Sequence, residues 1–519
     1  MPFLGEADWG GPYEAYKSAL GNLNSEFVRF APWFANPRVV VPELTPHVCT
    51  ATQPSTNWNS TYFDGVMKDF MEAVCGPDAA KGACTHSVVQ QLSTMPEYMY
   101  VGGDANPLPA YPWNTTDPFD EYKAGNALVD PTCKQMARYF GRLVGWYTNG
   151  GFTDECGHFH PSEFHYDWWG ISVLNEDEHA IKPENGPAYT TCYDAIKIEV
   201  EKVNKKVTLV GPEVVMEWGY MEYFLKAENH ADKQAPPVAS YHWFGGMVNN
   251  NTGEDFMTRW MSDYWDPNGI VQGIQRTIAA TGQKTEAVLN EYIPFINDWC
   301  NCTGLESLCG NSVLPAMCPD WQKPSTGGGY AHYDLRTKKG LGINRATWSW
   351  NSAAAVFALG YATLAELGYK YVGADQLVGG TWPDNEPAVS CMDWQTGETN
   401  VKYHAIKMLA DSVGSKANKT IYNSTLTGAG TGGAGTKHAG PIHVMPYTMA
   451  GKKAMLVVNM KQTAQVLTIV GATEGAAVSV LEVDVNSKEP GFAGPPITRK
   501  VGANGAVALG PFAIALVDM

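Results

Sequence analysis

The chain is poor in positive charge. Its 519 residues include 36 lysines and arginines against 53 aspartates and glutamates, so the formal net charge is −17. Proteins that bind nucleic acid need a basic surface for the phosphate backbone, and anionic membranes attract basic segments. The charge balance therefore argues against a nucleic-acid partner and against binding to a membrane surface.

Long apolar runs and a secretory leader are also lacking. No stretch approaches the roughly 20 apolar residues that a membrane-spanning helix needs. Residues 1–11 contain Glu6 and Asp8 and lack the apolar segment of a signal peptide. The G-x-S-x-G pattern of esterases and the glycine loops that bind phosphate are absent too. These absences leave esterase and kinase hypotheses without support.

Cysteines and glycosylation sequons indicate an oxidising compartment. Four of the 11 cysteines lie close together, at positions 300, 302, 309 and 318, without the paired C-x2-C spacing of zinc sites. Disulfide bonds are therefore the favoured interpretation. Six N-x-[S/T] sequons begin at Asn59, Asn114, Asn250, Asn301, Asn418 and Asn423. We expect a secreted glycoprotein, or one of a lysosome-like compartment, with disulfide bonds and no metal or other cofactor.

A second group of metal-binding residue types falls between positions 156 and 165. Its members are Cys156, His158, His160, Glu163 and His165. The i, i+4 spacing of H-E-x-x-H is missing and Pro161 interrupts the segment. We interpret the segment as a surface loop, with a metal site as the minority alternative.

Short β-rich runs alternate with helical stretches over about the first 410 residues. Strands are expected at 27–30, 39–42, 88–92, 169–174, 207–210, 238–241, 287–290 and 371–377. Helices are expected at 61–75, 131–147, 190–204, 219–226, 268–281, 343–367 and 401–413. This order predicts an α/β fold with a parallel sheet and crossover helices, a (β/α)8 TIM barrel.

The last hundred residues have a different pattern. A segment rich in Gly, Ala and Thr at 427–440 is typical of a linker, and β-type runs follow at 454–459, 465–470, 477–483 and 506–517. Their close spacing predicts a small antiparallel β-sandwich. We expect a catalytic barrel over 1–415 and a β-sandwich accessory domain over 416–519, with the N-terminal residues as candidates to pair with it.

Two of the expected strands end in the same dipeptide. Asn175-Glu176 follows the strand at 169–174, and Asn290-Glu291 ends the strand at 287–290, so the two glutamates are 115 residues apart. Side chains at the carboxyl ends of barrel strands face the active site. Retaining glycosidases need two carboxyl groups about 5 Å apart, one as acid/base and one as nucleophile. A single glutamate after a strand is usually a solvated loop residue, but two matching pairs favour catalysis.

Other residues near these strand ends are candidate substrate contacts. They are Arg29, Asn175, Tyr241, His242, Trp350 and Trp382. Asn175 can donate a hydrogen bond to a sugar hydroxyl, a contact that strengthens in the transition state. For the aromatic residues ordinary packing is a close alternative, and Arg29 equally fits a structural ion pair.

Several segments resemble glycoside hydrolase family 39 and its relatives among the retaining barrel hydrolases of clan A. The similar segments are 28–34, 143–155, 169–176, 240–242, 289–291, 373–379 and 392–403. The resemblance extends from about residue 25 to the C-terminus and implies that Glu176 is the acid/base and Glu291 the nucleophile. Activities of the family include β-xylosidase and α-L-iduronidase. The cysteine-rich segment after Glu291 departs from the family pattern, so neither activity transfers directly.

These observations lead to one main hypothesis and one alternative. The main hypothesis is a retaining O-glycosyl hydrolase that cleaves an oligo- or polysaccharide by double displacement, β-xylosidase-like or a related exo-glycosidase. The alternative is a catalytically silent glycan-binding or cell-surface structural protein on the same barrel. The presence of both Glu176 and Glu291 favours the enzyme. The sugar, the linkage, exo or endo action and the oligomeric state stay open.

Overall fold

The computed structural model falls into two compact units. It describes residues 13–31, 41–43, 46–50, 58, 61–92, 95–102, 127–175, 186–215, 218–244, 270–293, 344–374, 377, 391–392, 397–413, 419–427, 442–461, 463–482 and 495–519. The first unit includes Phe27–Trp243 and Ile274–Asn290, and the second includes Gly10–Glu26, Phe244–Gly273 and Glu291–Met519. The domain boundary expected near residue 415 stays a prediction.

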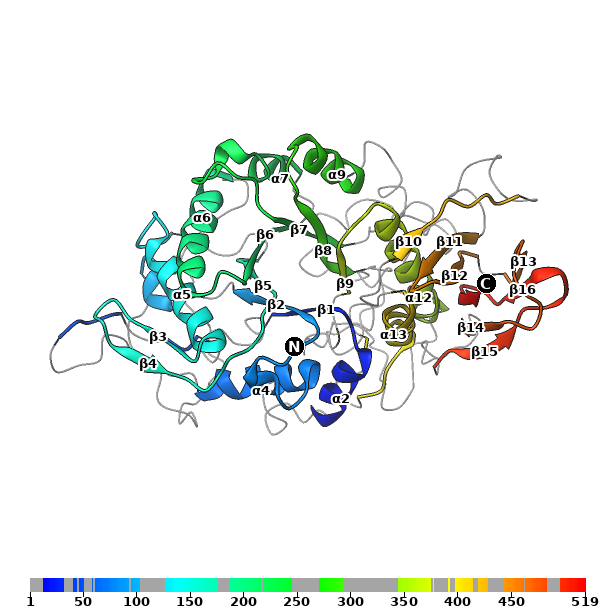
Figure 1. Cartoon of the computed structure of the whole chain (residues 1–519), viewed down its shortest axis with the longest axis horizontal. Coiled ribbons are helices and arrows are strands. Elements are labelled where there is room, and N and C mark those ends of the chain that lie inside the picture. The colour runs from blue at the N-terminus through cyan, green and yellow to red at the C-terminus, as the bar shows by residue number, and fades with distance from the viewer. Residues whose placement is uncertain are drawn as a thin grey trace, which may run out of the picture. The chain divides into compact units, whose positions relative to one another are not determined.

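The main sheet follows the order of the chain (Figure 1). Its strands, in sheet order, are β1 (Phe27–Phe30), β2 (Ser87–Leu92), β5 (Gly170–Val173), β6 (Thr208–Val215), β7 (Val238–Phe244), β8 (Glu286–Ile293) and β9 (Tyr371–Ala374). The pairs from β1 to β7 are parallel. Both β2 and β5 are buried at every position, as expected for parallel strands covered on both faces. The fold is TIM-barrel-like.

Seven of the eight expected strands are confirmed. The prediction for 39–42 was wrong in its described part, because Val41 and Pro42 belong to no strand. Proline has no backbone N–H to give to a ladder, which weakens a β-rich run that ends in one. Within the described residues the sheet therefore has seven strands, and an eight-stranded barrel is not confirmed.

All seven expected helices are confirmed. They are α4 (Thr61–Cys75), α5 (Lys134–Thr148), α6 (Gly186–Val203), α7 (Trp218–Phe224), α9 (Ile270–Ala280), α12 (Asn344–Glu366) and α13 (Val401–Ser412). The stacked rings of Phe30 and Phe70, with centroids 4.1 Å apart, attach α4 to β1. The helix α2 (Tyr13–Leu23) was not predicted. Among the described helices none combines the length and apolar character needed to cross a bilayer.

The second unit contains an antiparallel sheet near the C-terminus. Its strands, in sheet order, are β10 (Lys419–Ile421), β11 (Ile442–Met449), β12 (Lys452–Asn459), β17 (Ile514–Asp518), β14 (Ala477–Leu481) and β15 (Ile497–Lys500). A two-stranded sheet pairs β13 (Gln465–Thr468) with β16 (Ala506–Leu509). Buried Val457 and Val480 of the larger sheet share a core with Val507 and Leu509 of the smaller one. The expected run 506–517 is thus two strands, β16 and β17.

Three disulfide bonds confirm that the chain forms disulfides. They join Cys49 to Cys156, Cys75 to Cys84 and Cys133 to Cys192. The cysteines at 300, 302, 309 and 318 lie outside the described residues.

Candidate active site

Buried polar side chains gather toward the carboxyl ends of the strands in the first unit. We call them the Glu213 cluster, and its members are Arg29, Gln91, Ser172, Asn175, Glu213, Ser240, His242 and Asn290. The side chain of Arg29 is 8% exposed, and every other member is at most 4% exposed. Because this end of the sheet carries the active site in TIM-barrel enzymes, the cluster is the candidate site.

The backbone at Glu213 turns its side chain toward the neighbouring strands. The register of β6 against β7 shifts between Pro212 and Val214, so Glu213 is the extra residue of a bulge. Its φ is +60°, in the left-handed region that residues with a Cβ rarely adopt. Bulges beside active sites re-aim side chains, and such backbone outliers concentrate at functional sites.

The carboxylate of Glu213 accepts hydrogen bonds from three other strands. Ser240 Oγ donates to Oε1 at 2.5 Å, and Asn290 Nδ2 donates to Oε2 at 2.5 Å. Arg29 Nη2 lies 3.0 Å and His242 Nε2 3.1 Å from Oε2. Burial favours the neutral acid, but the charge of Arg29 and the hydrogen bond from His242 outweigh it and lower the pKa of Glu213. Glu213 is therefore ionised at neutral pH.

Arg29 extends the cluster to β2 and to Asn175, the second residue after β5. Its Nη2 donates to Gln91 Oε1 and, at 2.7 Å, to Asn175 Oδ1. The amide of Gln91 in turn donates to the carbonyl of Leu174. Leu174 has a φ of +61°, so the backbone that leads into Asn175 is held in an uncommon conformation by this bond. Side chain and backbone together fix the orientation of Asn175.

The structure brings three of the predicted substrate contacts together, namely Arg29, Asn175 and His242. Tyr241 is 1% exposed, and the alternation along β7 puts its side chain on the opposite face from Ser240 and His242. Glu291 continues β8 directly after Asn290 and is half-buried. Glu176, Trp382 and the side chain of Trp350, on α12, lie outside the described residues, so their roles and that of Tyr241 stay predictions.

Sequence reasoning missed the central residue, Glu213. The signal is the Gly211-Pro212-Glu213 sequence directly after the apolar run 207–210, at a strand end like those of the two Asn-Glu pairs. Gln91 was missed as well. A glutamine inside an otherwise apolar, buried strand must find hydrogen-bond partners, which marks it as a network residue.

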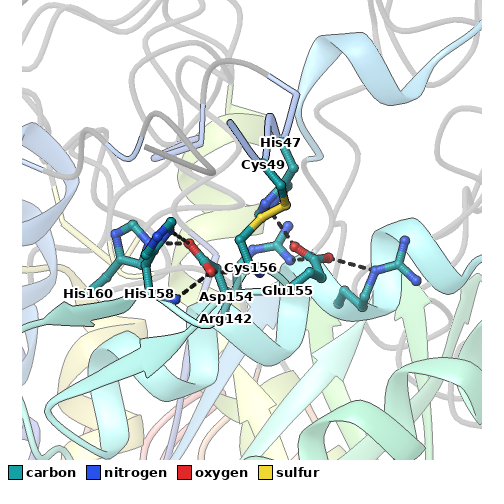
Figure 2. Close-up of a disulfide and its surroundings, with 9 residues drawn as sticks. His47, Cys49, Arg142, Asp154, Glu155, Cys156, His158 and His160 are labelled. Carbon is teal, nitrogen blue, oxygen red and sulfur yellow. Dashed lines mark hydrogen bonds and ion pairs between the residues drawn. A yellow bond between two sulfur atoms is a disulfide. The ribbon is translucent and has the colours of Figure 1, made fainter. Parts of the chain in front are cut away.

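A second set of charged side chains, only part of it buried, lies near the disulfide between Cys49 and Cys156 (Figure 2). We call it the His47 cluster, and its members are Glu43, His47, Tyr98, Arg138, Arg142 and Glu155. Arg142 binds fully buried Glu43 through two hydrogen bonds of 2.8 Å each, and Tyr98 donates to the same carboxylate at 2.6 Å.

His47 joins the two carboxylates of this cluster. Its Nε2 lies 3.0 Å from Glu43 Oε1 and its Nδ1 2.8 Å from Glu155 Oε2. Burial opposes the charged ring, but the hydrogen bonds to Glu155 and Glu43 raise the pKa of His47 to about 9. The hydrogen bond from His47 and the charge of Arg142 lower the pKa of Glu155 to about 2 although burial opposes the change. His47 and Glu155 are therefore both charged at neutral pH.

The metal alternative for 156–165 gains no support from the described residues. The sulfur of Cys156 is in a disulfide, and His160 Nε2 lies 2.8 Å from Asp154 Oδ2. The backbone N–H groups of Cys156 and His158 both donate to Asp154 Oδ1 at 2.9 Å, closing a turn before the hairpin strand β4 (Phe159–Pro161). No group of three or more metal-binding side chains occurs in the part of the chain that the structure describes.

Comparison with known proteins gives a fold but no sequence relative. No protein-family model and no curated protein matches the chain.

Solved structures do match over nearly the whole length. A family 51 α-L-arabinofuranosidase from Bifidobacterium longum is 11% identical with a TM-score of 0.54, covering 98% of this chain and 92% of that one. An α-L-arabinofuranosidase from Thermotoga maritima is 10% identical with a TM-score of 0.53 and the same coverage. A family 30 subfamily 8 xylanase from Clostridium acetobutylicum is 11% identical with a TM-score of 0.52, covering 98% and 94%. The chain therefore has the TIM-barrel-like fold shared by clan A glycoside hydrolases of families 30 and 51.

Proposed function

We propose that the protein is a retaining glycoside hydrolase in which Glu176 is the acid/base and Glu291 the nucleophile. One observation supports this above all. Asn175 and Asn290, which directly precede the two glutamates, are joined through Arg29 and Glu213 by hydrogen bonds of 2.5–3.0 Å. The network fixes the two asparagines, and with them the two strand ends that lead into the glutamates, relative to each other, as a site that uses both glutamates needs.

The chemistry follows the double-displacement scheme. The Glu291 carboxylate attacks the anomeric carbon while the Glu176 carboxyl group protonates the departing glycosidic oxygen. Glu176 then removes a proton from water, and this water cleaves the ester between the sugar and Glu291, which restores both groups. Asn175 holds a sugar hydroxyl during both steps, and Tyr241, Trp350 and Trp382 are proposed to line the sugar subsites.

We propose a pentose-containing glycan as the substrate class. The similar structures are named as a xylanase and as arabinofuranosidases, and the sequence resembles family 39, which includes β-xylosidases. We also propose a secreted or lysosome-like location for the chain as a glycoprotein. Three disulfide bonds support the location, and the exposed position of Asn423 leaves that sequon open to glycosylation.

The test compares Glu291→Ala with Glu286→Ala, which removes a glutamate from the other end of β8. The substrates are 4-nitrophenyl β-D-xyloside, α-L-arabinofuranoside and β-D-glucoside. We expect Glu291→Ala to lose at least about 1000-fold in kcat, and Glu286→Ala to stay close to wild type. Azide should restore turnover to Glu291→Ala by taking the place of the missing carboxylate, releasing a glycosyl azide.

A 2-fluoro glycoside should also add one sugar mass to wild type at the peptide that contains Glu291. Normal turnover by Glu291→Ala would reject the assigned nucleophile. Tight glycan binding by wild type without any turnover or labelling would instead support the catalytically silent alternative.

A further inference from the structure

The two asparagines of the Glu213 cluster are held with opposite hydrogen-bond polarity. Asn175 uses its Oδ1 to accept from Arg29, because a guanidinium has donors only. Asn290 uses its Nδ2 to donate to Glu213, because an ionised carboxylate accepts only. Among the described residues no hydrogen bond engages the other end of either amide, which is a donor in Asn175 and an acceptor in Asn290.

The acceptor end of Asn290 has no donor within the described residues. The residue is 4% exposed, and its Oδ1 is buried without a hydrogen bond. Nearly all buried polar atoms in native proteins are paired, so such an atom beside a candidate nucleophile indicates a donor that arrives with a ligand. A sugar hydroxyl is a donor of this kind, and Asn290 directly precedes Glu291 in β8.

We propose that the Arg29–Glu213 ion pair sets the hydrogen-bond polarity of the site, presenting Asn290 as an acceptor for one sugar hydroxyl and Asn175 as a donor to another sugar oxygen. This inference rests on the proposed glycosidase function and adds a rule of specificity to it. A sugar whose hydroxyl at the Asn290 position is removed or O-methylated cannot donate, so the site rejects it. Glu213 acts through Asn290 and is a positioning residue.

The charge on Glu213 is what makes the polarity unambiguous. A neutral glutamine or a protonated acid in its place has both a donor and an acceptor. The Asn290 amide could then bind it in either of two orientations related by a 180° flip. The lowered pKa of Glu213, to which Arg29 and His242 contribute, keeps that charge in place at neutral pH although burial opposes it. The bulge at Glu213 supplies the direction, since it turns the carboxylate toward β7 and β8.

Glu43 offers a matched control in the same unit. It is also 0% exposed and bound by an arginine and a histidine, but its partners belong to the His47 cluster. Glu213→Gln and Glu43→Gln therefore remove the same charge from equally buried ion pairs. We expect kcat/KM of Glu213→Gln to fall at least 100-fold at a temperature where both variants are folded by circular dichroism. Glu43→Gln should stay within about twofold of wild type.

A second variant, Asn290→Ala, leaves Glu213 bound to Arg29, Ser240 and His242 and so keeps the buried ion pair. It tests the inference even if Glu213→Gln does not fold. The probes are the 4-nitrophenyl glycoside that wild type hydrolyses fastest and its mono-deoxy analogues. In wild type, one deoxy position should lower kcat/KM at least 100-fold. In Asn290→Ala, that same analogue and its parent should react at equal rates.

The outcomes separate the two proposals. One outcome is that each deoxy analogue lowers kcat/KM, relative to its parent glycoside, by the same factor in wild type and in Asn290→Ala. That result would mean that Asn290 Oδ1 contacts water or protein instead of a sugar hydroxyl. It would overturn the inference and leave the glycosidase function intact. Matching losses in Glu213→Gln and Glu43→Gln would overturn the positioning role of Glu213. Wild type that turns over no glycoside in the panel rejects the proposed function, and the inference with it.

Discussion

The Glu213 cluster and the His47 cluster are built from the same parts and differ in what they leave unpaired. Each has a fully buried glutamate held by an arginine and a histidine. In the His47 cluster both oxygens of Glu43 are paired: Arg142 donates to each, and Tyr98 and His47 add contacts to Oε1. The Nδ1 of His47 is buried without a well-formed hydrogen bond, although it lies 2.8 Å from the charged Glu155 Oε2. In the Glu213 cluster the contacts pass through two side-chain amides, and the Oδ1 of Asn290 finds no hydrogen-bond donor among the described residues.

The backbone differs in the same way. Leu174 and Glu213 have left-handed φ values of +61° and +60°, whereas Glu43, His47, Arg142 and Glu155 are not among the described residues with positive φ. An uncommon backbone conformation and an unsatisfied acceptor both cost stability, and a site tolerates them when they position groups for a ligand. A closed set of ion pairs on relaxed backbone serves stability. The comparison therefore favours a functional role for the Glu213 cluster and a structural role for the His47 cluster, and the variants below test that proposal.

Replacing the central arginine by lysine should give the largest difference between the clusters. Lysine keeps the charge but loses the planar fork, so Arg29→Lys cannot hold Gln91, Asn175 and Glu213 together. We expect kcat/KM of Arg29→Lys to fall about 1000-fold, which corresponds to about 4 kcal/mol of transition-state stabilisation. Arg142→Lys should lower the urea midpoint of unfolding and leave kcat/KM within about twofold.

The test is the difference in kcat/KM between Arg29→Lys and Arg142→Lys. If Arg142→Lys lost as much activity as Arg29→Lys in folded protein, the His47 cluster would belong to the functional site and the distinction drawn above would be wrong. If Arg29→Lys kept full activity, Asn175 and Asn290 would not depend on the arginine for their orientation.

Most of the fold could be predicted from the sequence because its elements are locally encoded. The apolar run 207–210 predicts a strand and the amphipathic segment before it predicts a helix, each from its own residues, and α4 was predicted with its observed bounds, Thr61–Cys75. The strand prediction was wrong at Val41 and Pro42 because a β-rich run does not show whether a neighbouring strand is available to pair with it. The helix α2 depends on tertiary contacts such as the hydrogen bond from Tyr403 to the carbonyl of Ala19, which no local pattern contains.

Members of the Glu213 cluster were predicted only where a polar or charged residue follows or ends an apolar strand-like run. The two Asn-Glu pairs and Arg29 stood out as strand-end polar residues, and the structure groups Arg29 with Asn175 and Asn290. Glu213 was missed although it follows the apolar run 207–210, because its inward direction comes from a register shift and a positive φ rather than from strand alternation. A bulge changes which face a residue occupies, so a period of two assigns its side chain to the wrong side.

Removing the disulfide from the His47 cluster should give the next largest effect, and only on stability. Cys49 and Cys156 close a loop with a sequence separation of 107 residues. Loss of such a crosslink typically costs about 3 kcal/mol through the greater freedom of the unfolded chain. We expect the free energy of unfolding of Cys49→Ser/Cys156→Ser, measured by urea unfolding, to be lower by that amount, with unchanged kcat and KM. A loss of activity in the folded double variant would connect this cluster to catalysis.

The smallest effect concerns pH and isolates His47. Its folded pKa of about 9 lies above the ordinary value of 6.5, so its stabilisation is complete below about pH 6.5 and is lost as the pH rises through 9. The folded pKa of Glu155, about 2, lies below its ordinary 4.5, so its stabilisation is complete above about pH 4.5 and is lost as the pH falls through 2. The cluster should therefore stabilise the fold most between about pH 4.5 and 6.5.

His47→Gln tests this directly. The free energy of unfolding of wild type should exceed that of His47→Gln by on the order of 2 kcal/mol at pH 6, and the difference should shrink toward pH 9.5. Asp64, whose pKa burial raises to about 6, titrates in both proteins and cancels in the difference. A difference that stays constant from pH 6 to pH 9.5 would show that the His47 ring contributes by packing rather than by charge.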